Sequence, residues 1–432
     1  MKRPGILLLC AVLAVTVLLW IFAKVDGGAV GIVRSLAQLS ALLAATLAVL
    51  NYVLAARART IERLFGGLDK MYMVHRLVGG GAFLFMLYHP IFLAVNVLPN
   101  WSLALRYFIP GGNLAYTLGI IALALFIVLI VLTIFVRLPY HFWKRTHILM
   151  GIPLVFVGFH TFIVPSDASS FWPLTAWMAL LFAAAGMAVV YKRFLYTRFG
   201  PRFSYTIRGV VQLGAVTEIQ LVPHGAPLSF LPGQFVFVSF LSARLSPEKH
   251  PFTISSSPSS PELRLSVKNL GDWTSGLAAL SLGTDAVVYG PYGVFGERAF
   301  RGTQDQVWIA GGIGITPFLG IAAARANAPE TRGVAHLFYC TKTKEEAVYL
   351  RELEDIAART KTFRVTSHVS DEKGFITAER VLAIAGVPAD GLRALPVFLC
   401  GPKPMTDGLI EQLEALGVGG KNIIREDFSF FS

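Results

Sequence analysis

Residues 75–90, HRLVGGGAFLFMLYHP, place two histidines inside an apolar run long enough to cross a membrane. An α-helix has 3.6 residues per turn and rises about 1.5 Å per residue, so His75 and His89 would lie about 21 Å apart along the axis and about 40° apart around it. The two imidazoles would then face the same way at two depths. Histidine is rare within membrane spans and usually functional there, so this stretch predicts both a membrane helix and a site.

The composition indicates a membrane protein with a soluble part. Of 432 residues, 54% are hydrophobic and 15% charged, with a mean hydropathy of +0.60, whereas soluble domains average about 25% charged residues. The first run follows Lys2 and Arg3 but is longer than the apolar core of a usual signal peptide, so we expect it to remain as a span. Six runs are each long enough to span hydrocarbon about 30 Å thick: residues 6–23, 30–55, 71–98, 114–136, 147–165 and 171–191.

Basic residues gather in the segments after the second, fourth and sixth spans: Arg57, Arg59, Arg63, Lys70, Arg137, Lys144, Arg145, Lys192, Arg193 and Arg198. The opposite loops hold little beyond Lys24 and Arg106. The positive-inside rule therefore predicts that the amino terminus, these basic segments and the carboxy-terminal half are cytoplasmic. The same clustering explains much of the net charge of +12, so we expect a lipid bilayer as partner, no nucleic acid and no obligatory protein partner.

A second pair of histidines, His147 and His160, lies thirteen residues apart in the fifth span, which runs in the same direction as the third. Two helices with one histidine each at two depths are suited to hold two stacked haems, each iron taking one imidazole from either helix. Thirteen residues leave His160 about 140° from His147 on an ideal helix, and Pro153 between them is expected to kink the helix and correct this. The alternative is that these histidines form interhelical hydrogen bonds.

Other chemistry-bearing residues of the membrane half are fewer. Arg34, near the outer end of the second span, is a candidate to meet a haem propionate or polarise an acceptor such as dioxygen; the alternative is a snorkelling interface residue. His141, in the basic segment LPYHFWKR, is expected to be a solvated loop residue. Cys10, Cys340 and Cys400 are scattered, which disfavours an iron–sulfur cluster, a zinc ribbon and c-type haem.

From about residue 202 the pattern changes to short β-like stretches such as FSYTIRGVVQL and QFVFVSF, which predict a small antiparallel barrel. Small hydroxyl residues in HPFTISSSP (from His250), with Lys268 and the backbone after Gly271, are candidates to bind a flavin and its pyrophosphate. The alternative is that these are ordinary strand and turn sequences.

The strand VWIAGG then runs into GGIGITPFLGIAAARA. Gly311, Gly312 and Gly314 would let backbone approach a phosphate, and Thr316 is expected to cap the following helix. Further strand and helix alternation predicts a doubly wound nucleotide-binding domain with Cys400 at its ligand crevice. The domains are expected at residues 1–198 (six membrane helices), 199–298 (β-barrel) and 299–432 (α/β).

The motifs HPFTISS, VKNLGDWT, GGIGITP, CGPKPM and the terminal REDFSFFS, together with the paired histidines, closely resemble the ferric reductase and NADPH oxidase superfamily, particularly its compact bacterial NADPH oxidase members. The resemblance spans nearly the whole chain, and the order of the motifs makes it specific. It implies a six-helix di-haem domain in the bacterial cytoplasmic membrane, fused to a ferredoxin-NADP reductase-like module that binds FAD and NADPH, with NADH as the alternative.

The resemblance also implies roles for individual residues. Thr253 would lie near the reactive flavin nitrogen, and the terminal aromatics, best Phe430 or Phe431, would cover the flavin ring. The haem irons would be held by His75, His89, His147 and His160. The remaining cofactor contacts would be His250, Pro251, Phe252 and Ser255 for the flavin, Lys268, Gly271, Trp273 and Thr274 for its pyrophosphate, Gly311, Gly312, Gly314 and Thr316 for the dinucleotide phosphates, and Cys400, Gly401 and Pro402 beside the nicotinamide.

The expected activity is electron transfer from cytoplasmic NAD(P)H through FAD and two haems to an outer acceptor, dioxygen or a ferric chelate. Leu93 stands four residues after His89, where some oxidases carry a further histidine, and no calcium-binding loop precedes the spans.

The choice of dinucleotide depends on the segment after FYCT. Lys342 and Lys344 favour a 2′-phosphate and hence NADPH, although Glu345 and Glu346 follow them. Other readings are a reductase feeding a quinone or a protein, and a nucleotide-regulated transporter whose histidines relay protons.

Overall fold

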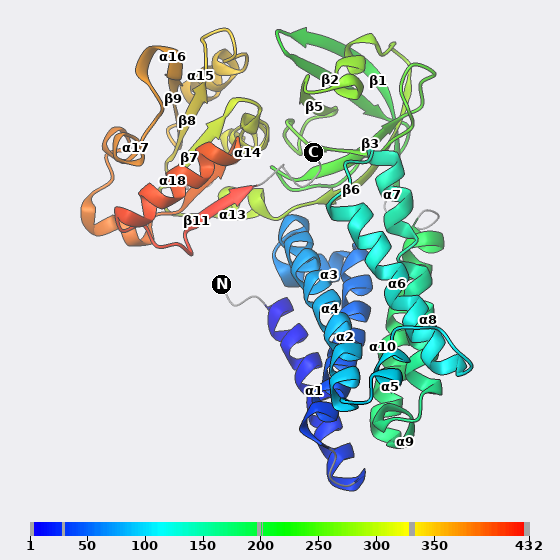
Figure 1. Ribbon diagram of the computed structural model, residues 1–432. Coiled ribbons are helices and arrows are strands. Elements are labelled where there is room, and N and C mark those ends of the chain that lie inside the picture. The colour runs from blue at the N-terminus through cyan, green and yellow to red at the C-terminus, as the bar shows by residue number, and fades with distance from the viewer. Residues whose placement is uncertain (1–3, 28–30, 197–199, 201, 328–332, 427–432) are drawn as a thin grey trace. The chain divides into compact units, whose positions relative to one another are not determined.

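The computed structural model describes residues 4–27, 31–196, 200, 202–327 and 333–426. The chain divides into two compact units (Figure 1), which are described separately. The helical unit comprises Lys2–Phe65 and Lys70–Arg198, and the carboxy-terminal unit consists mainly of Phe199–Ser432.

In the helical unit, six stretches of the described chain are long and apolar enough to cross a membrane, as the sequence predicts: Pro4–Lys24, Ile32–Ala55, Lys70–Asn96, Leu114–Ile134, Phe142–Ile163 and Trp172–Leu195. They are formed by α1 (Pro4–Gly27), α2 (Ile32–Ala55), α4 (Leu68–Asn96), α6 (Leu114–Ile134), α7 (Tyr140–Ile148), α8 (Gly151–Ile163), α10 (Trp172–Val190) and the π-helical turn η1 (Tyr191–Leu195). Short helices α3 (Arg59–Phe65), α5 (Trp101–Leu105) and α9 (Asp167–Ser170) connect them.

The fifth span is interrupted between its two histidines. Helix α7 ends at Ile148 and α8 begins at Gly151, two residues before Pro153. Proline lacks an N–H and its ring clashes with the carbonyl four residues earlier, here that of Leu149, which instead accepts from the N–H of Ile152 (2.9 Å). The break predicted from Pro153 is therefore present. The segment LPYHFWKR, in contrast, is not a loop, since Tyr140 already begins α7 after Pro139; the side chain of His141 lies outside the described residues.

Helix α2 is the most enclosed of the six spans. Half of its apolar window is buried, against 11–22% for the others. Its small side chains, including Ala44, Ala45 and Ala48, let neighbouring helices approach closely. Thr46 of α2 contacts Thr16 of α1 (Oγ1 to Oγ1, 3.3 Å), which accepts from the indole N–H of Trp177 on α10 (2.9 Å). Such hydrogen bonds stabilise helix packing where hydrophobic burial gives no net gain.

The first part of the carboxy-terminal unit is a curled antiparallel sheet. Its strand order is β4-β3-β6-β1-β2-β5. An isolated bridge between Ile254 and Leu265 links the two ends, so the sheet curls into a partly closed barrel, called the half-barrel below. The strands are β1 (Arg202–Leu213), β2 (Val216–Pro223), β3 (Phe235–Phe240), β4 (His250–Thr253), β5 (Leu263–Lys268) and β6 (Asp285–Tyr292), with the short helices α12 (Asp272–Ser275) and η2 (Gly276–Ala279) after β5.

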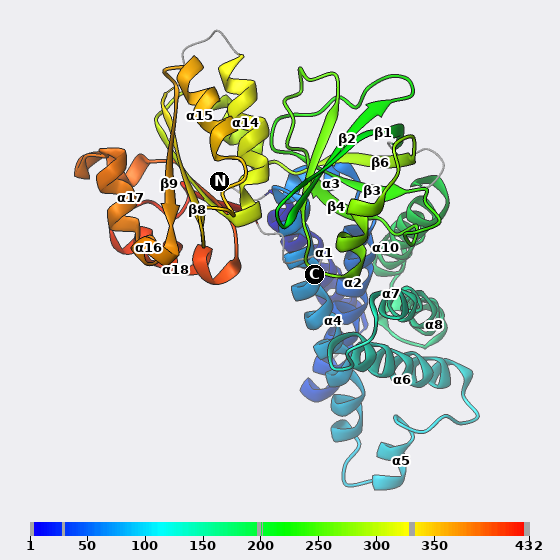
Figure 2. The same ribbon diagram turned by 90° about the horizontal axis from the view of Figure 1, so that it is seen from above.

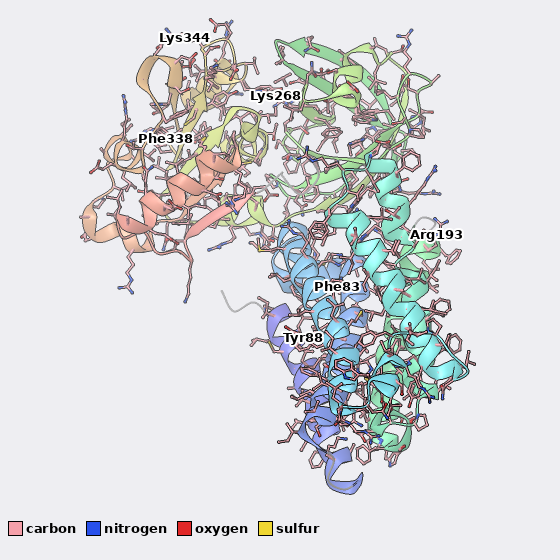
Figure 3. The ribbon with its side chains drawn as sticks, in the orientation of Figure 1. Phe83, Tyr88, Arg193, Lys268, Phe338 and Lys344 are labelled. Atoms are coloured by element: carbon pink, nitrogen blue, oxygen red, sulfur yellow. The ribbon has the colours of Figure 1, made fainter. Side chains whose placement is uncertain are left out.

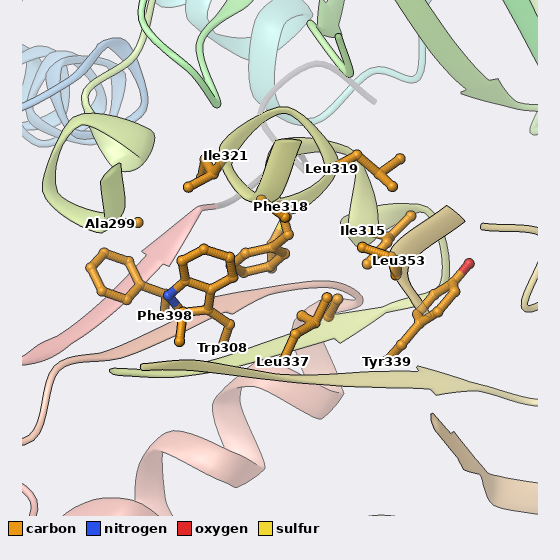
Figure 4. Close-up of a cluster of buried hydrophobic side chains, with 14 of the residues drawn as sticks. Ala299, Trp308, Ile315, Phe318, Leu319, Ile321, Leu337, Tyr339, Leu353 and Phe398 are labelled. Carbon is orange, nitrogen blue, oxygen red and sulfur yellow. The ribbon is translucent and has the colours of Figure 1, made fainter. Parts of the chain in front are cut away.

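The second part is a five-stranded parallel sheet in the order β11-β10-β7-β8-β9. Helices cover both of its faces (Figure 2), and Trp308, Leu337 and Tyr339 pack beneath Phe318 and Leu353 (Figure 4). The doubly wound fold is thus confirmed. Its elements are α13 (Phe295–Arg301), β7 (Gln306–Gly311), η3 (Gly312–Ile315), α14 (Thr316–Ala326), β8 (Ala335–Thr341), α15 (Leu350–Arg359), β9 (Phe363–Val369), α16 (Ser370–Lys373), α17 (Ala378–Ala385), η4 (Ala389–Ala394), β10 (Val397–Cys400), α18 (Lys403–Ala415) and β11 (Ile423–Glu426).

Candidate functional site

The four histidines of the helical unit form two pairs. His75 of α4 faces His147 of α7, with ring centroids 6.2 Å apart and ring planes at 67°. His89 of α4 faces His160 of α8, with centroids 6.3 Å apart and planes at 69°. The two pairs have nearly the same geometry, although α7 and α8 are separate helices. The break at Leu149 and Met150 removes the angular mismatch that an uninterrupted helix would have.

Backbone carbonyls orient three of the four imidazoles. Nδ1 of His75 donates to the carbonyl of Asn51 (3.2 Å) and Nδ1 of His89 to that of Ala37 (2.8 Å), both on α2. Nδ1 of His160 donates to the carbonyl of Ala115 on α6 (2.7 Å). A carbonyl only accepts, so Nδ1 carries the proton in each case and the Nε2 lone pair is left for a metal. Nδ1 of His147 is buried with no such bond, and its ring stacks on that of Trp143 (5.2 Å, 7°).

The register of α2 against α4 explains these bonds. Ala37 and Asn51 are fourteen residues apart, as are His75 and His89. Because α2 and α4 run antiparallel as the second and third spans, equal spacing lets one helix supply an acceptor for each histidine of the other. Helix α2 therefore positions both imidazoles of α4 at once.

The spacing within each pair fits a metal between the two rings. A metal–imidazole bond is about 2 Å long and a ring nitrogen lies about 1.1 Å from the ring centre, so imidazoles on opposite sides of one ion would have centroids about 6.2 Å apart. The measured 6.2 and 6.3 Å agree with this value. Among the described residues no group of three or more His, Cys, Asp or Glu could hold a metal. An ion held by two imidazoles would take its remaining ligands from outside the described residues, and a macrocycle is one group that supplies them.

An apolar cavity lies beside the second pair. Its volume is about 100 Å³, which is smaller than the roughly 300–1,000 Å³ of ordinary ligand sites. Leu93, four residues after His89, is in its wall. None of the described lining residues is Asp, Glu, Lys or Arg: Ala41, Ala44, Ala45, Met86, His89, Pro90, Leu93, Tyr107, Tyr116, Gly119, Ile120, Ala122, Leu123, Phe126, Val157, His160 and Thr161.

Gly119, on α6, packs against the ring of His160. A Cβ added at Gly119 of α6 would lie 2.8 Å from Nδ1 and Cε1 of His160, closer than real Cβ contacts, so the imidazole occupies space that only glycine leaves. Arg34, near the start of α2, is exposed and is not among the residues that line the cavity.

The segment proposed for the flavin forms an aromatic cluster on the half-barrel. The indole of Trp273 lies over His250 (centroids 3.9 Å) and Phe252 (5.9 Å), and its N–H donates to the carbonyl of Ser246 (3.2 Å). Pro251 and Thr253 lie in the same strand, paired with β3. Ser255 is fully buried, and its hydroxyl contacts the carbonyl of Arg264 (3.1 Å) and the hydroxyl of Ser266 (2.9 Å). The hydroxyl of Ser255 thus already has hydrogen-bond partners within the barrel wall.

The loop after β5 is held by hydrogen bonds between its own residues. The hydroxyl of Thr274 accepts from the backbone N–H groups of Leu270 (2.9 Å) and Gly271 (3.0 Å) and contacts the carbonyl of Gly271 (3.0 Å). Lys268, labelled in Figure 3, is the last residue of β5, directly before this loop. The segment Lys268–Thr274 is therefore preorganised by its own hydrogen bonds, and two of its backbone donors already have a protein acceptor.

The glycine-rich turn and the segment after β10 meet at the carboxyl ends of adjacent parallel strands, where Ala310 pairs with Cys400. A Cβ at Gly314 would lie 2.2 Å from the carbonyl oxygen of Cys400, and one at Gly311 would lie 2.8 Å from Pro402 and 3.4 Å from Gly401. Gly312 has φ +54° and nothing within 4 Å of an added Cβ. The strand order reverses at β7, and ligands of doubly wound folds bind at that point.

Thr316 does not cap α14 as expected. The turn η3 precedes the helix, so Ile315 is the N-cap and Thr316 is the first helical residue. Its hydroxyl donates back to the carbonyl of Ile313 (3.1 Å), which is a local alternative open to Thr.

The two cysteines of the parallel sheet domain are both buried, and Cys400 is fully so. Burial raises the pKa of the Cys340 thiol to about 12, which excludes a thiolate there at neutral pH.

The segment proposed for the 2′-phosphate joins β8 to α15. Lys344 (Figure 3) forms an ion pair with Glu372 of α16 (2.9 Å), and the hydrogen bond and charge of that carboxylate raise the pKa of Lys344. The side chain of Lys342 is exposed, while its backbone N–H donates to Glu346 (3.3 Å). Phe430 and Phe431 lie outside the described residues.

Sequence reasoning missed the carbonyls of Ala37, Asn51 and Ala115 and the role of Gly119. The only sequence signal for the first two was the repeated fourteen-residue spacing, which has meaning once α2 and α4 are known to be antiparallel neighbours. Gly119 gives no local signal, because a single glycine in an apolar helix is ordinary.

Comparison with known families assigns all three regions. Residues 40–158 match the ferric reductase like transmembrane component, residues 211–305 an FAD-binding domain, and residues 308–410 the oxidoreductase NAD-binding domain. The first match contains His75, His89 and His147 and ends two residues before His160. The third begins in β7 and contains the glycine-rich turn and Cys400.

Among curated proteins, the chain is 34% identical over 157 residues to NADH-cytochrome b5 reductase 1 of Pyricularia oryzae, covering 34% of this chain and 49% of that protein. It is 27% identical over 226 residues to the reductase component of propane 2-monooxygenase from Rhodococcus jostii, covering 50% and 60%. The chain thus spans about half the length of the curated relatives it matches.

A solved flavohemoglobin from Malassezia yamatoensis, with bound FAD and heme, aligns with a TM-score of 0.52 at 18% identity over 91% of this chain and 98% of that one. At this identity the likeness concerns the fold alone. The family matches and the observed fold agree on the order of the three regions. The chain therefore has the ferric reductase/NADPH oxidase-like architecture, a ferric reductase-like transmembrane component followed by an FAD-binding domain and an NAD-binding oxidoreductase domain.

Proposed function

We propose that this protein transfers electrons from NAD(P)H on the cytoplasmic side, through FAD and two b-type haems, to dioxygen at the outer face, producing superoxide. The observation that carries the proposal is the presence of two imidazole pairs, with centroids 6.2 and 6.3 Å apart, in the same chain as an FAD-binding and an NAD-binding domain. A proton-relaying transporter would need neither the matched spacing nor the flavin domain.

The residues present fit two haems. His75 and His147 would hold one iron, and His89 and His160 the other. When bound, FAD accepts a hydride as an electron pair and each haem accepts one electron at a time, so the cofactors together convert two-electron into one-electron chemistry. The chain's own residues orient the imidazoles through the carbonyls of α2 and α6 and exclude water with the apolar wall beside His160.

In the carboxy-terminal unit, the aromatic cluster of His250, Phe252 and Trp273 would bind the flavin. The open backbone at Gly312 would meet the dinucleotide phosphates at the switch point of the sheet. NADPH remains the expected donor, with NADH as the alternative. The pairing of Lys344 with Glu372 leaves Lys342 as the better cation for a 2′-phosphate.

The proposed orientation rests on the basic segments that follow the second, fourth and sixth spans. Dioxygen as acceptor is supported by the resemblance and by the wall of the cavity next to His89 and His160, which has no charged residue among those described. An uncharged acceptor suits such a wall better than a charged ferric chelate does.

The test is the visible spectrum of the purified full-length protein in detergent, with a pyridine haemochrome count, before and after anaerobic addition of NADPH or NADH with FAD. We expect two b-type haems per chain, reduced by the dinucleotide and reoxidised by air with superoxide formation. Absence of haem would refute the proposal. Haem that is reduced but reoxidised only by a ferric chelate or a quinone would refute dioxygen as the acceptor.

A Gly119→Ala substitution should lower the haem content at the His89–His160 pair. The new methyl group would lie 2.8 Å from the His160 ring, and the imidazole cannot both move away and keep its bond to the Ala115 carbonyl. We expect the haem count to fall by at least about half of one equivalent, because misplaced ligands lose metal affinity by about 10–100-fold. Gly186→Ala is the matched control, since an added Cβ there has nothing within 4 Å; equal haem counts in both variants would contradict the packing argument.

A further inference from the structure

A charged cluster joins the half-barrel to the parallel sheet domain within the carboxy-terminal unit. Arg264 of β5 donates to both carboxylate oxygens of Glu352 on α15, from Nη1 to Oε2 at 2.9 Å and from Nη2 to Oε1 at 2.7 Å. The two residues are 88 positions apart in the chain. The side chain of Arg264 is 19% exposed and that of Glu352 34% exposed. A bidentate, largely buried ion pair of this kind fixes both the distance between the two side chains and their relative orientation.

A second carboxylate and a phenol complete the cluster. Oε2 of Glu218, on β2, lies 3.7 Å from Nη1 of Arg264 and accepts a weak hydrogen bond from the hydroxyl of Tyr349 (3.4 Å). Tyr349, directly before α15, is 2% exposed, and burial raises its pKa, so it remains a donor at neutral pH. Burial alone would lower the pKa of Arg264, but Glu352 and Glu218 raise it, so the cation persists.

The same guanidinium holds the flavin segment. Nη2 of Arg264 donates to the carbonyl of Ser255 (3.0 Å), while the N–H of Ser255 donates to the carbonyl of Arg264 (2.9 Å). Ser255 follows Thr253 by two residues. Next to it, Gly320 of α14 packs on the flavin segment so closely that an added Cβ would lie 2.9 Å from the carbonyl oxygen of Ser256. The side chain of Arg264 thus contacts both the backbone that follows β4 and Glu352 on α15, the helix that follows β8.

We propose that Arg264 is a positioning residue for hydride transfer, because it locks the flavin segment to the nucleotide-binding domain through Glu352. This inference rests on the proposed function. The step that it positions moves one hydride, with its two electrons, from the reduced nicotinamide to the flavin, and solvent supplies the accompanying proton. Arg264 touches neither reactant; it sets their separation, and a displacement of about 1 Å costs about 100-fold in rate.

The experiment uses full-length protein loaded with FAD and follows flavin reduction by NADPH and NADH under anaerobic stopped-flow conditions. Arg264→Gln and Glu352→Gln should each slow flavin reduction by at least about tenfold, with FAD content unchanged and a primary isotope effect retained with C4-deuterated dinucleotide. The double variant should be scarcely slower than either single one, because both break the same contact. Arg264→Lys should recover part of the rate.

Arg208→Gln is the matched control. It removes the same charge from an exposed pair with Glu262 (3.0 Å, Arg208 67% exposed) in the same unit and should leave the rate unchanged. Wild-type rates in the Arg264 and Glu352 variants would overturn the inference, as would a slow rate explained by loss of FAD. If the wild-type flavin is reduced by neither dinucleotide, the proposed function itself fails.

Discussion

On the proposed function, replacing His89 with alanine will yield a protein with one haem per chain instead of two, and electron delivery to the outer acceptor will fall by at least about 100-fold. The imidazole of His89 faces that of His160 across 6.3 Å, and alanine leaves one side of that site without a ligand. Reduction of FAD by NAD(P)H will continue at the wild-type rate, because the flavin and nucleotide sites belong to the other unit. The measurements are a pyridine haemochrome count, superoxide formation and anaerobic flavin reduction.

The control for this variant is His224→Ala, which removes an exposed histidine of the half-barrel. It should retain both haems and full superoxide formation. Two haems and undiminished acceptor reduction in His89→Ala would refute the ligand assignment and favour the reading in which the histidines form hydrogen bonds only.

Substituting Gly314 with alanine should have the largest effect in the carboxy-terminal unit. The added Cβ would lie 2.2 Å from the carbonyl oxygen and 2.5 Å from the carbonyl carbon of Cys400. Because both are backbone atoms at the centre of a parallel sheet, no side-chain rotation relieves the contact. The turn must separate from β10, which we expect to cost about 3 kcal/mol of stability, the upper end of the usual cost of added bulk at a packed site.

The consequence for activity is that NAD(P)H will no longer reduce the flavin at a measurable rate, while the haem count stays at two. The readouts are thermal unfolding of the carboxy-terminal unit, flavin reduction and the haem spectrum. Gly408→Ala, in α18 of the same domain, is the control, since an added Cβ there has nothing within 4 Å. Flavin reduction at the wild-type rate by Gly314→Ala would show that the turn tolerates the shift.

Local patterns made much of the fold predictable. A membrane helix satisfies all its backbone hydrogen bonds within one segment, so apolar length suffices to find it. A proline breaks its own helix, so the interruption before Pro153 could be placed from the sequence. The alternation of strands and helices after Gly302 likewise indicates a doubly wound sheet. Two helix starts were predicted wrongly: α7 already begins at Tyr140, and Thr316 is not the N-cap of α14. Helix ends depend on competition between nearby hydrogen-bond partners.

The sequence by itself determined the six apolar helices, the histidines that they carry, the half-barrel and the parallel sheet, since each depends on residues within one turn, one strand or one motif. Only the tertiary structure decided which groups meet. The carbonyls of Ala37 and Asn51 reach His89 and His75 because α2 and α4 pack in one antiparallel register. The His160 ring fits against Gly119, and Arg264 binds Glu352 across 88 residues. Such contacts depend on how elements are rotated and shifted against one another, and packing of the whole unit sets those variables.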